Sequence, residues 1–245
     1  MAMFDLKSLL SENSYPGRGI VIGKSADGRS ALIAYFIMGR SENSRNRIFE
    51  RFDGGMRTKA FDESKLSDPH LIIYNPYLSA KGGNIDIITN GDQTNTIFDY
   101  INEVDHAFGF EAACDVREFE DDAPNFTPRI SGILYYSFPE NTFSYKMSIL
   151  KSANGRGESC RRYYFNYNVP ENGIGHFIHT YKCDGNPIPS FEGEPEFVEL
   201  PPASPADFAE AVWNSLNADN KVSLYVNYTS LEDGKEYVVI KNKNV

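Results

Sequence analysis

The sequence predicts an α+β protein, and three observations support this class. Many short segments rich in Ile, Val, Phe and Tyr lie between turn residues, which is the pattern of β-strands. Only two or three segments have helical periodicity. The chain has 245 residues, 41% hydrophobic and 13% aromatic, enough for a substantial core. Together these proportions favour a pair of packed sheets with helices on their outer faces.

The predicted strands are bounded by recognisable turns. Ala26-Asp27-Gly28 is expected to join the first two strands as a hairpin, and Asp233-Gly234 is expected to join the last two. Pro139-Glu140-Asn141 is expected to turn the chain in the middle. The strands are expected at residues 18–23, 29–38, 84–89, 130–136, 142–152, 161–169, 175–182, 222–228 and 235–241.

The clearest helical spacing begins at Ile97 and continues through Val104 and Phe108, which would share one face. It predicts one long helix, or two helices joined near Gly109, over residues 94–119.

A further helix is expected after Ser204, because serine is a good N-cap and Pro205 suits the first helical position. Its apolar residues Phe208 and Val212 would face the core. Another helix is expected over residues 4–12.

Charge and composition exclude several classes of protein. Lys plus Arg is 24 and Asp plus Glu is 34, so the net charge is −10, which argues against non-specific binding to nucleic acid or to a membrane surface. There is no transmembrane-length apolar run and no apolar signal segment near the N-terminus. Three scattered cysteines argue against a disulfide framework. We therefore expect a cytoplasmic protein that forms one domain over residues 1–245.

The most basic segment is 39–47, which follows an apolar strand. Arg40, Arg45 and Arg47 alternate there with serines and asparagines. Guanidinium groups suit phosphate and stay charged when partly buried. A solvated loop is the alternative, but a basic cluster in an acidic chain favours an anion site.

Two further segments carry polar residues at expected element ends. Asn90 and Gly91 precede the long helix, as either an anion site or an ordinary strand-to-helix turn. Residues 118–122 hold four carboxylates at its other end, where a solvated helix end is the alternative to a functional site. Arg129 opens the next strand and could pair with one of these acids.

The histidines do not suggest a metal site. His176 and His179 lie three residues apart in a predicted strand, so their side chains would point to opposite faces and could not bind one metal there.

Read together, several motifs resemble the archaeal-type inosine monophosphate (IMP) cyclohydrolase family, in order along most of the chain. Residues 1–14 have no counterpart and form an N-terminal extension. The matching segments are Tyr15-Pro16-Gly17-Arg18, Ala34-Tyr35, Gly39-Arg40-Ser41, Asn46-Arg47, Asn75-Pro76-Tyr77, Thr89-Asn90-Gly91, Thr127-Pro128-Arg129-Ile130 and the helix with Ser204-Pro205 and Ala209-Glu210.

The resemblance implies a four-layer αββα sandwich of the N-terminal-nucleophile hydrolase type, with a pocket between two sheets. It implies ring closure of 5-formamidoimidazole-4-carboxamide ribonucleotide to IMP with loss of water, without metal or cofactor. The partner would be a purine ribonucleotide, and the sequence does not decide between a monomer and a homo-oligomer. By the resemblance Arg47 and Glu120 are catalytic, and the substrate-binding candidates are Arg18, Arg40, Asn46, Tyr77, Asn90, Gly91, Thr127 and Arg129.

Two other functions stay open from the sequence. One is an amidohydrolase of the same fold that acts on a C–N bond after processing exposes a residue such as Ser8, Ser11 or Ser14. The intact mass of the native protein would reveal this processing. The other is a non-catalytic purine-nucleotide binding protein, which thermal shifts without turnover would identify. The sequence starts at Met1 with no exposed nucleophile, which favours a non-covalent cyclisation.

Overall fold

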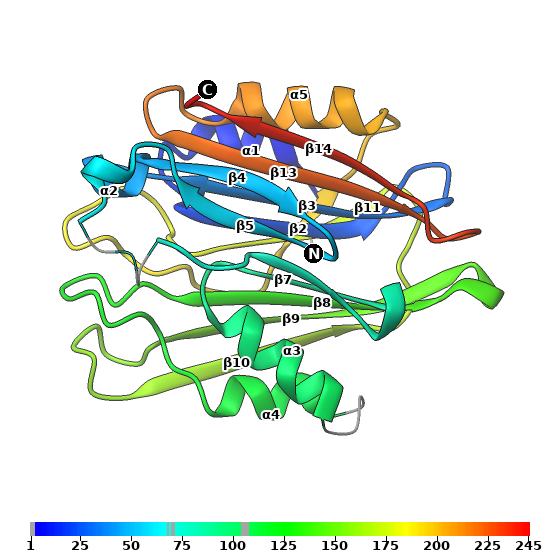
Figure 1. Cartoon of the computed structure of the whole chain (residues 1–245), viewed down its shortest axis with the longest axis horizontal. Helices are drawn as coiled ribbons and strands as arrows, with labels where there is room; N and C mark the ends of the chain where they lie inside the picture. The colour runs from blue at the N-terminus through cyan, green and yellow to red at the C-terminus, as the bar shows by residue number, and fades with distance from the viewer. Residues whose placement is uncertain (1–2, 68, 70–71, 104–107) are drawn as a thin grey trace.

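Two seven-stranded β-sheets pack face to face and carry helices on their outer sides (Figure 1). The computed structural model describes residues 3–67, 69, 72–103 and 108–245, and every count of elements refers to that part of the chain. The structure is α+β, which confirms the fold class predicted from strand and helix patterns.

The first sheet is antiparallel except for one parallel pair at its edge. In spatial order its strands are β1 (Phe4–Asp5), β12 (Glu196–Glu199), β11 (Ile174–His179), β2 (Arg18–Lys24), β3 (Ser30–Met38), β13 (Lys221–Ser230) and β14 (Glu236–Asn242). The short β1 runs parallel to β12. Both predicted hairpins are confirmed, since β2 pairs with β3 and β13 pairs with β14 in antiparallel register.

The second sheet is an antiparallel meander. In spatial order its strands are β10 (Cys160–Tyr167), β9 (Thr142–Ser152), β8 (Arg129–Ser137), β7 (Ile85–Thr89), β6 (Tyr77–Ala80), β5 (Gly55–Ala60) and β4 (Arg47–Phe52). The predicted turn after Pro139 is confirmed and joins β8 to β9. The hairpin of β4 and β5 was not predicted. Its turn is Asp53-Gly54, in which Gly54 has a φ of +76°, a conformation that glycine adopts most readily.

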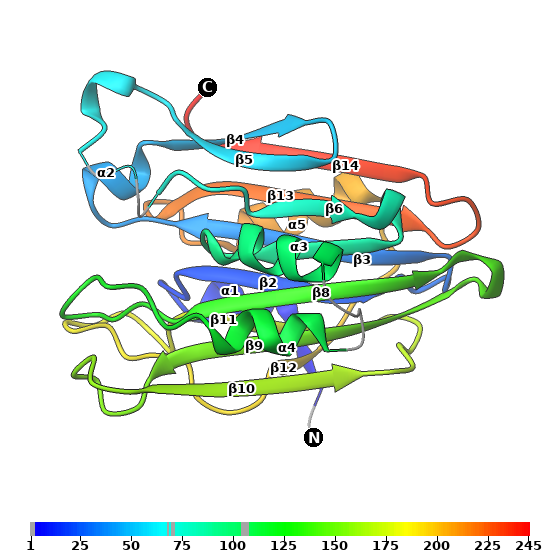
Figure 2. The ribbon, with the colours of Figure 1, turned by 60° about the horizontal axis from the view of Figure 1, so that its bottom comes forward.

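The described α-helices are α1 (Leu6–Glu12), α2 (Glu42–Arg45), α3 (Gln93–Glu103), α4 (Gly109–Asp115) and α5 (Pro205–Ser215). All but the short α2, which lies at one end of the sheets, cover the outer faces of the sheets. α1 and α5 pack on the first sheet, and α3 and α4 pack on the second (Figures 1 and 2). The predicted start of α5 is confirmed, because the Ser204 hydroxyl accepts a hydrogen bond from the Asp207 amide.

The segment predicted as one helix or two over residues 94–119 forms two shorter helices, and α4 ends at Asp115. Val104 lies outside the described residues. Phe108 does not join the buried face as its spacing predicted, since it is 72% exposed and occupies the N-cap position of α4. Residues 118–122 therefore lie in a loop rather than at a helix end.

The main core lies between the sheets. Alternate residues of β3 point to opposite sides: Ile33 and Tyr35 join the core between the sheets, while Leu32 and Phe36 pack toward α1 and α5. This strand is apolar throughout because its sheet is covered on both faces. Burying each large apolar side chain stabilises the fold by ~1.5–3 kcal/mol.

A side-chain amide joins the edge of the second sheet to the end of the first. Asn242 Oδ1 accepts a hydrogen bond from the Phe49 amide at 2.8 Å, and Asn242 Nδ2 donates to the Phe49 carbonyl at 3.1 Å. These two bonds occupy both main-chain groups of Phe49 in the edge strand β4.

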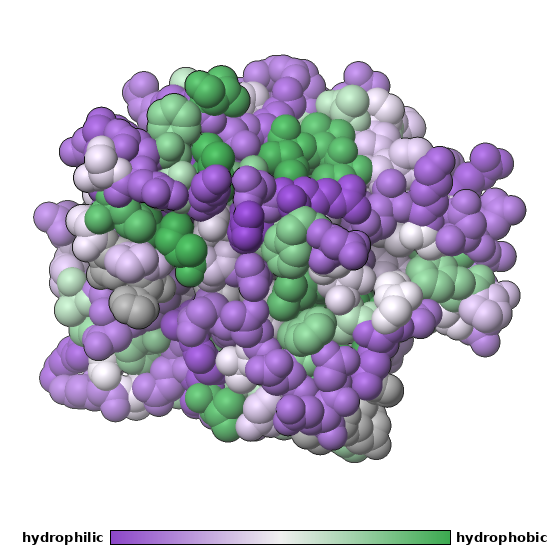
Figure 3. Space-filling view, in the orientation of Figure 1, coloured by the Kyte–Doolittle hydropathy of each residue, from purple (hydrophilic) through white to green (hydrophobic). Residues whose placement is uncertain are grey.

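The surface agrees with the acidic composition. Hydrophilic residues cover most of the face seen in Figure 3, with hydrophobic residues between them. Among the described helices, none combines the length and the apolar character needed to cross a bilayer.

Candidate functional site

A pocket of about 230 Å³ lies at the α2 end of the two sheets. Residues from both sheets line it, together with the loop that follows α4. It brings together five of the predicted site residues, which are far apart in the sequence: Arg18, Arg40, Arg47, Glu120 and Thr127.

Arg47 is the most buried charged residue of this pocket, with 1% of its surface exposed. It begins β4, and its Nε donates to the Ser44 carbonyl at 2.8 Å. Its Nη1 is buried without a hydrogen-bond partner among the described residues. Burial lowers the pKa of Arg47, yet an arginine stays protonated in proteins. A buried, charged donor without a partner is costly, so this atom is suited to a ligand.

Glu120 is 3% exposed and lies in the loop after α4. Its main-chain N–H donates to the Thr127 carbonyl at 2.9 Å, and its Oε2 lies 3.3 Å from Arg18 Nη2. Burial raises the pKa of the Glu120 carboxyl, although the charges of Arg18, Arg129 and Arg47 act to lower it. A carboxyl with a raised pKa is suited to proton transfer near neutral pH.

The other two pocket arginines differ in exposure. Burial is the strongest single influence and acts to lower the pKa of Arg18, but the combined interactions with Glu120, Tyr181, Tyr74 and Tyr35 raise it well above the ordinary value. Arg40 lies at the rim with 37% of its side chain exposed, and pairs with Asp184. Its guanidinium lies 5.0 Å from the ring centroid of Tyr15.

Arg129 lies near Glu120 but forms its ion pair with an acid that was not predicted. Its Nη1 lies 2.7 Å from Asp92 Oδ1 and donates to Gln93 Oε1 at 2.7 Å, so its partner is Asp92 rather than an acid of 118–122. A Cβ on Gly91 would lie 2.5 Å from this Nη1 and 3.6 Å from Glu120 Oε1. Glycine at position 91 therefore allows the guanidinium to approach the carboxylate.

Asn90 holds the neighbouring loop and does not line the pocket. It is fully buried, its Nδ2 donates to the Pro128 carbonyl at 2.9 Å, and its Oδ1 accepts from the Ile130 amide at 2.8 Å. These bonds fix the strand end that carries Arg129.

Two more of the predicted substrate-binding residues, Asn46 and Tyr77, also lie outside the pocket. Asn46 exchanges two hydrogen bonds with the main chain of Asp62, at 2.7 and 2.8 Å, and so holds a loop. The Tyr77 hydroxyl lies at the opposite end of the sheets, 2.8 Å from Asp86 and 2.7 Å from Glu236. Tyr77 therefore does not line the pocket that holds Arg47 and Glu120.

Tyrosines of the pocket were not singled out from the sequence. Tyr181 lines its wall, and Tyr15 stacks on Tyr181 with ring centroids 5.8 Å apart. Tyr35 and Tyr74 share a hydroxyl–hydroxyl hydrogen bond of 2.8 Å and interact electrostatically with Arg47. Tyr15 and Tyr35 belong to matched motifs, but nothing in the sequence around Tyr181 marks it as functional.

The two histidines do not line this pocket. His176 Nδ1 lies 2.7 Å from the Tyr145 hydroxyl of the second sheet, and His179 is buried beside Phe177 and Phe191. Burial lowers the pKa of both histidines to about 4, so both are neutral at pH 7.

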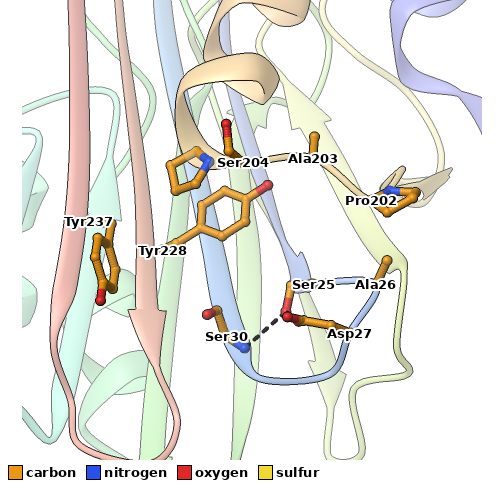
Figure 4. A pocket seen from close by; sticks show the side chains of 10 residues that line it. Ser25, Ala26, Asp27, Ser30, Pro202, Ala203, Ser204, Tyr228 and Tyr237 are labelled. Carbon is orange, nitrogen blue, oxygen red and sulfur yellow. Dashed lines mark hydrogen bonds between the residues drawn. The ribbon is translucent and has the colours of Figure 1, made fainter.

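A second pocket, of about 320 Å³, lies between the β2–β3 turn and the start of α5 (Figure 4). The Ser25 hydroxyl accepts from the Ser30 amide at 2.9 Å and donates to Asp27 at 2.6 Å. No basic residue lines this pocket in the described part of the chain. The first pocket, by contrast, is lined by Arg18, Arg40 and Arg47.

Comparison with known proteins identifies the family. The model of the family described as IMP cyclohydrolase-like protein matches residues 15–235. A search of curated proteins gave no match. Since the match covers most of the chain, the chain belongs to the IMP cyclohydrolase-like family, as the order of its motifs predicted.

Proposed function

We propose that this chain catalyses the closure of 5-formamidoimidazole-4-carboxamide ribonucleotide to IMP with loss of water, the last step of purine nucleotide synthesis. One observation carries the proposal. The pocket combines Arg47, a buried guanidinium with a free donor atom, and Glu120, a buried carboxyl with a raised pKa. Membership of the IMP cyclohydrolase-like family supports the same reaction.

The reaction needs a base because the attacking nitrogen is an amide, whose lone pair is delocalised. Both reacting groups belong to one molecule, so the enzyme gains little from bringing them together and more from orientation and charge. Glu120 accepts a proton from the carboxamide nitrogen as the new C–N bond forms to the formyl carbon. General base catalysis of this kind contributes ~10²–10⁴-fold.

The formyl oxygen becomes negative in the tetrahedral intermediate, and Arg47 Nη1 donates to it. A fixed donor at such an oxygen is worth ~3–4 kcal/mol. Glu120 returns its proton to this oxygen, which then leaves as water with the hydrogen of the former formamido nitrogen. That nitrogen becomes doubly bonded to the same carbon, and no metal or organic cofactor is needed for any step.

Arg18 and Arg40 have different proposed tasks. Arg18 holds the Glu120 carboxylate through their 3.3 Å contact. Arg40 binds the 5′-phosphate at the rim, because its partly exposed pair with Asp184 is worth little and is readily exchanged for a phosphate contact. Arg129 and Gly91 lie next to the Glu120 carboxyl, and the positive charge of Arg129 favours its ionised form.

The order of layers across the molecule supports a finer description of the fold. Helices α1 and α5, the first sheet, the second sheet, and helices α3 and α4 follow one another, which is the order of a four-layer αββα sandwich of the N-terminal-nucleophile hydrolase type. An enzyme of nucleotide synthesis with this pocket would act in the cytoplasm.

The test is to incubate pure protein with the formylated ribonucleotide and to follow the absorbance of the product. We expect a rate well above the spontaneous reaction, and IMP should raise the melting temperature. A rate equal to the background would refute the proposal. A thermal shift by IMP without turnover would instead assign the chain to non-catalytic nucleotide binding.

A further inference from the structure

Tyr181 is held in the pocket wall from several sides. Its ring stacks on Tyr15, its main-chain N–H donates to the Pro16 carbonyl at 3.2 Å, and its carbonyl accepts a hydrogen bond from His179 Nδ1 at 2.7 Å. A Cβ on Gly17, which has a φ of +78°, would lie 2.5 Å from the ring. Three residues of the motif that precedes Arg18 are therefore arranged around Tyr181.

A chain of hydrogen bonds fixes the direction of the Tyr181 hydroxyl. Thr127 Oγ1 contacts Asp122 Oδ2 and lies 2.5 Å from the Tyr181 hydroxyl. The other Asp122 oxygen accepts from the Thr127 amide at 2.6 Å. A carboxylate only accepts hydrogen bonds, so the Thr127 hydroxyl donates to Asp122 and its oxygen accepts the Tyr181 proton. Tyr181 then presents acceptor lone pairs, and no proton, to the pocket.

The phenol keeps this proton at neutral pH. Burial raises the pKa of Tyr181, although the charge of Arg18 acts to lower it. The Tyr181 oxygen is therefore a neutral acceptor that suits an O–H or N–H group of a ligand.

The contacts along the wall place Tyr181 between the rim and the proposed reacting groups. On one side, Tyr15 separates it from Arg40 at the rim. On the other side, Thr127 links it to Glu120, whose amide donates to the Thr127 carbonyl at 2.9 Å. With phosphate at Arg40 and carboxamide at Glu120, the part of the nucleotide that reaches Tyr181 is the ribose.

We infer that Tyr181 determines sugar specificity by accepting a hydrogen bond from a ribose hydroxyl, so that the pocket selects ribonucleotides over deoxyribonucleotides. The inference rests on the proposed function, since it uses the proposed placement of the nucleotide. A sugar without that hydroxyl leaves the buried Tyr181 oxygen without a donor, which is costly in a site closed to water.

The test compares the affinity of IMP with that of its 2′-deoxy and 3′-deoxy analogues by calorimetry. We expect the unmodified protein to bind one of the two analogues about tenfold more weakly than IMP. Tyr181→Phe keeps the ring and removes the acceptor, so it should bind IMP about tenfold more weakly and lose the discrimination. Tyr228→Phe is the matched control, because Tyr228 is a buried tyrosine outside this pocket. It should leave the IMP affinity and the discrimination between IMP and its analogues unchanged.

The outcomes separate this inference from the function on which it rests. Equal binding of IMP and both analogues, or discrimination that persists in Tyr181→Phe, overturns the role of Tyr181 and leaves the cyclohydrolase proposal intact. Absence of any IMP binding and of turnover overturns both. Melting temperatures of the two variants show whether either substitution disturbs the fold.

Discussion

The space between the sheets holds polar groups at both of its ends, and the two ends differ in how these groups are satisfied. Strand β3 connects them, from Ala31, which pairs with Thr229, to Met38, which lines the pocket. At the pocket end, Arg47 and Arg18 keep buried guanidinium nitrogens without partners among the described residues. A buried donor without an acceptor costs free energy unless a bound ligand supplies the acceptor.

At the opposite end, the buried Tyr77, Asp86 and Tyr136 and the partly exposed Glu236, which we call the far cluster, are joined by hydrogen bonds between their hydroxyl and carboxyl groups. Asp86 accepts hydrogen bonds from the hydroxyls of Tyr77 and Tyr136, each at 2.8 Å. Tyr77 also lies 2.7 Å from Glu236 of the other sheet. The two ends therefore differ in one respect: the hydroxyl and carboxyl groups of the far cluster are hydrogen-bonded, whereas the guanidinium groups of the pocket keep buried donors that favour a ligand.

The largest expected effect is that of Glu120→Gln. The amide keeps the shape of the carboxyl but cannot accept the carboxamide proton, so kcat should fall ~10²–10⁴-fold. IMP affinity, measured by calorimetry, should change only a few-fold. Glu118→Gln is the matched control, because Glu118 belongs to the same acidic run and is exposed. Turnover retained by Glu120→Gln would assign the base to another residue.

Arg47→Gln should lower kcat by ~10²–10³-fold through loss of the donor to the formyl oxygen. Arg45→Gln provides the comparison within the same basic segment, since Arg45 donates to Gly39 and Asn220 and does not line the pocket. Steady-state kinetics of both variants measure the difference. An equal fall in kcat in the two variants would mean that Arg47 only holds the basic segment in place and does not contact the reacting atoms.

In the far cluster, Asp86 should control stability and not activity. Burial raises the pKa of Asp86 to about 6, so the folded protein holds this proton more tightly than the unfolded chain. The free energy of unfolding should therefore fall by ~3 kcal/mol as the pH rises from about 4 through 6, at ~1.4 kcal/mol for each pKa unit. Denaturant unfolding at several pH values measures this, and Asp86→Asn should abolish that part of the pH dependence. An unchanged profile in Asp86→Asn would contradict the assignment.

The smallest effect is expected for Tyr77→Phe. Loss of the hydroxyl leaves Asp86 and Glu236 without their shared hydrogen-bond partner and should cost ~1–3 kcal/mol of stability. The KM and kcat of the variant should equal those of the unmodified protein, because Tyr77 lies away from the pocket. A raised KM would restore the substrate-binding role that the motif suggested.

Local signals predicted the elements that begin or turn with distinctive residues. Asp27-Gly28 and Ser204-Pro205 identified a hairpin and a helix start, because their backbone preferences act over a few residues. The hairpin of β4 and β5 was missed although Asp53-Gly54 is a similar turn. Its strands carry charged residues such as Glu50 and Arg57, which obscure the alternation of apolar and polar residues.

The candidate site was predictable only in part. The family resemblance pointed to Arg47 and Glu120, but composition alone favoured a solvated surface for the acidic run. The burial of Glu120 depends on contacts with Arg18, which lies more than a hundred residues away in the sequence. Tyr181 could not be found, because its environment is built by Tyr15 and Gly17 from the other end of the chain. The surroundings of such a residue are formed by segments that are distant in the sequence, so they cannot be predicted from the residues next to it.

The bond pair between Asn242 and Phe49 has a consequence for self-association. An exposed edge strand can recruit a strand from another molecule, and long edges are therefore prone to aggregation. The Asn242 carboxamide bonds the Phe49 amide and carbonyl as a peptide group of a neighbouring strand would. It therefore occupies the middle of the β4 edge, two residues from Arg47. Deamidation of Asn242 to Asp would keep an acceptor for the Phe49 amide but remove the donor to the Phe49 carbonyl, which would leave this carbonyl of the edge strand unpaired.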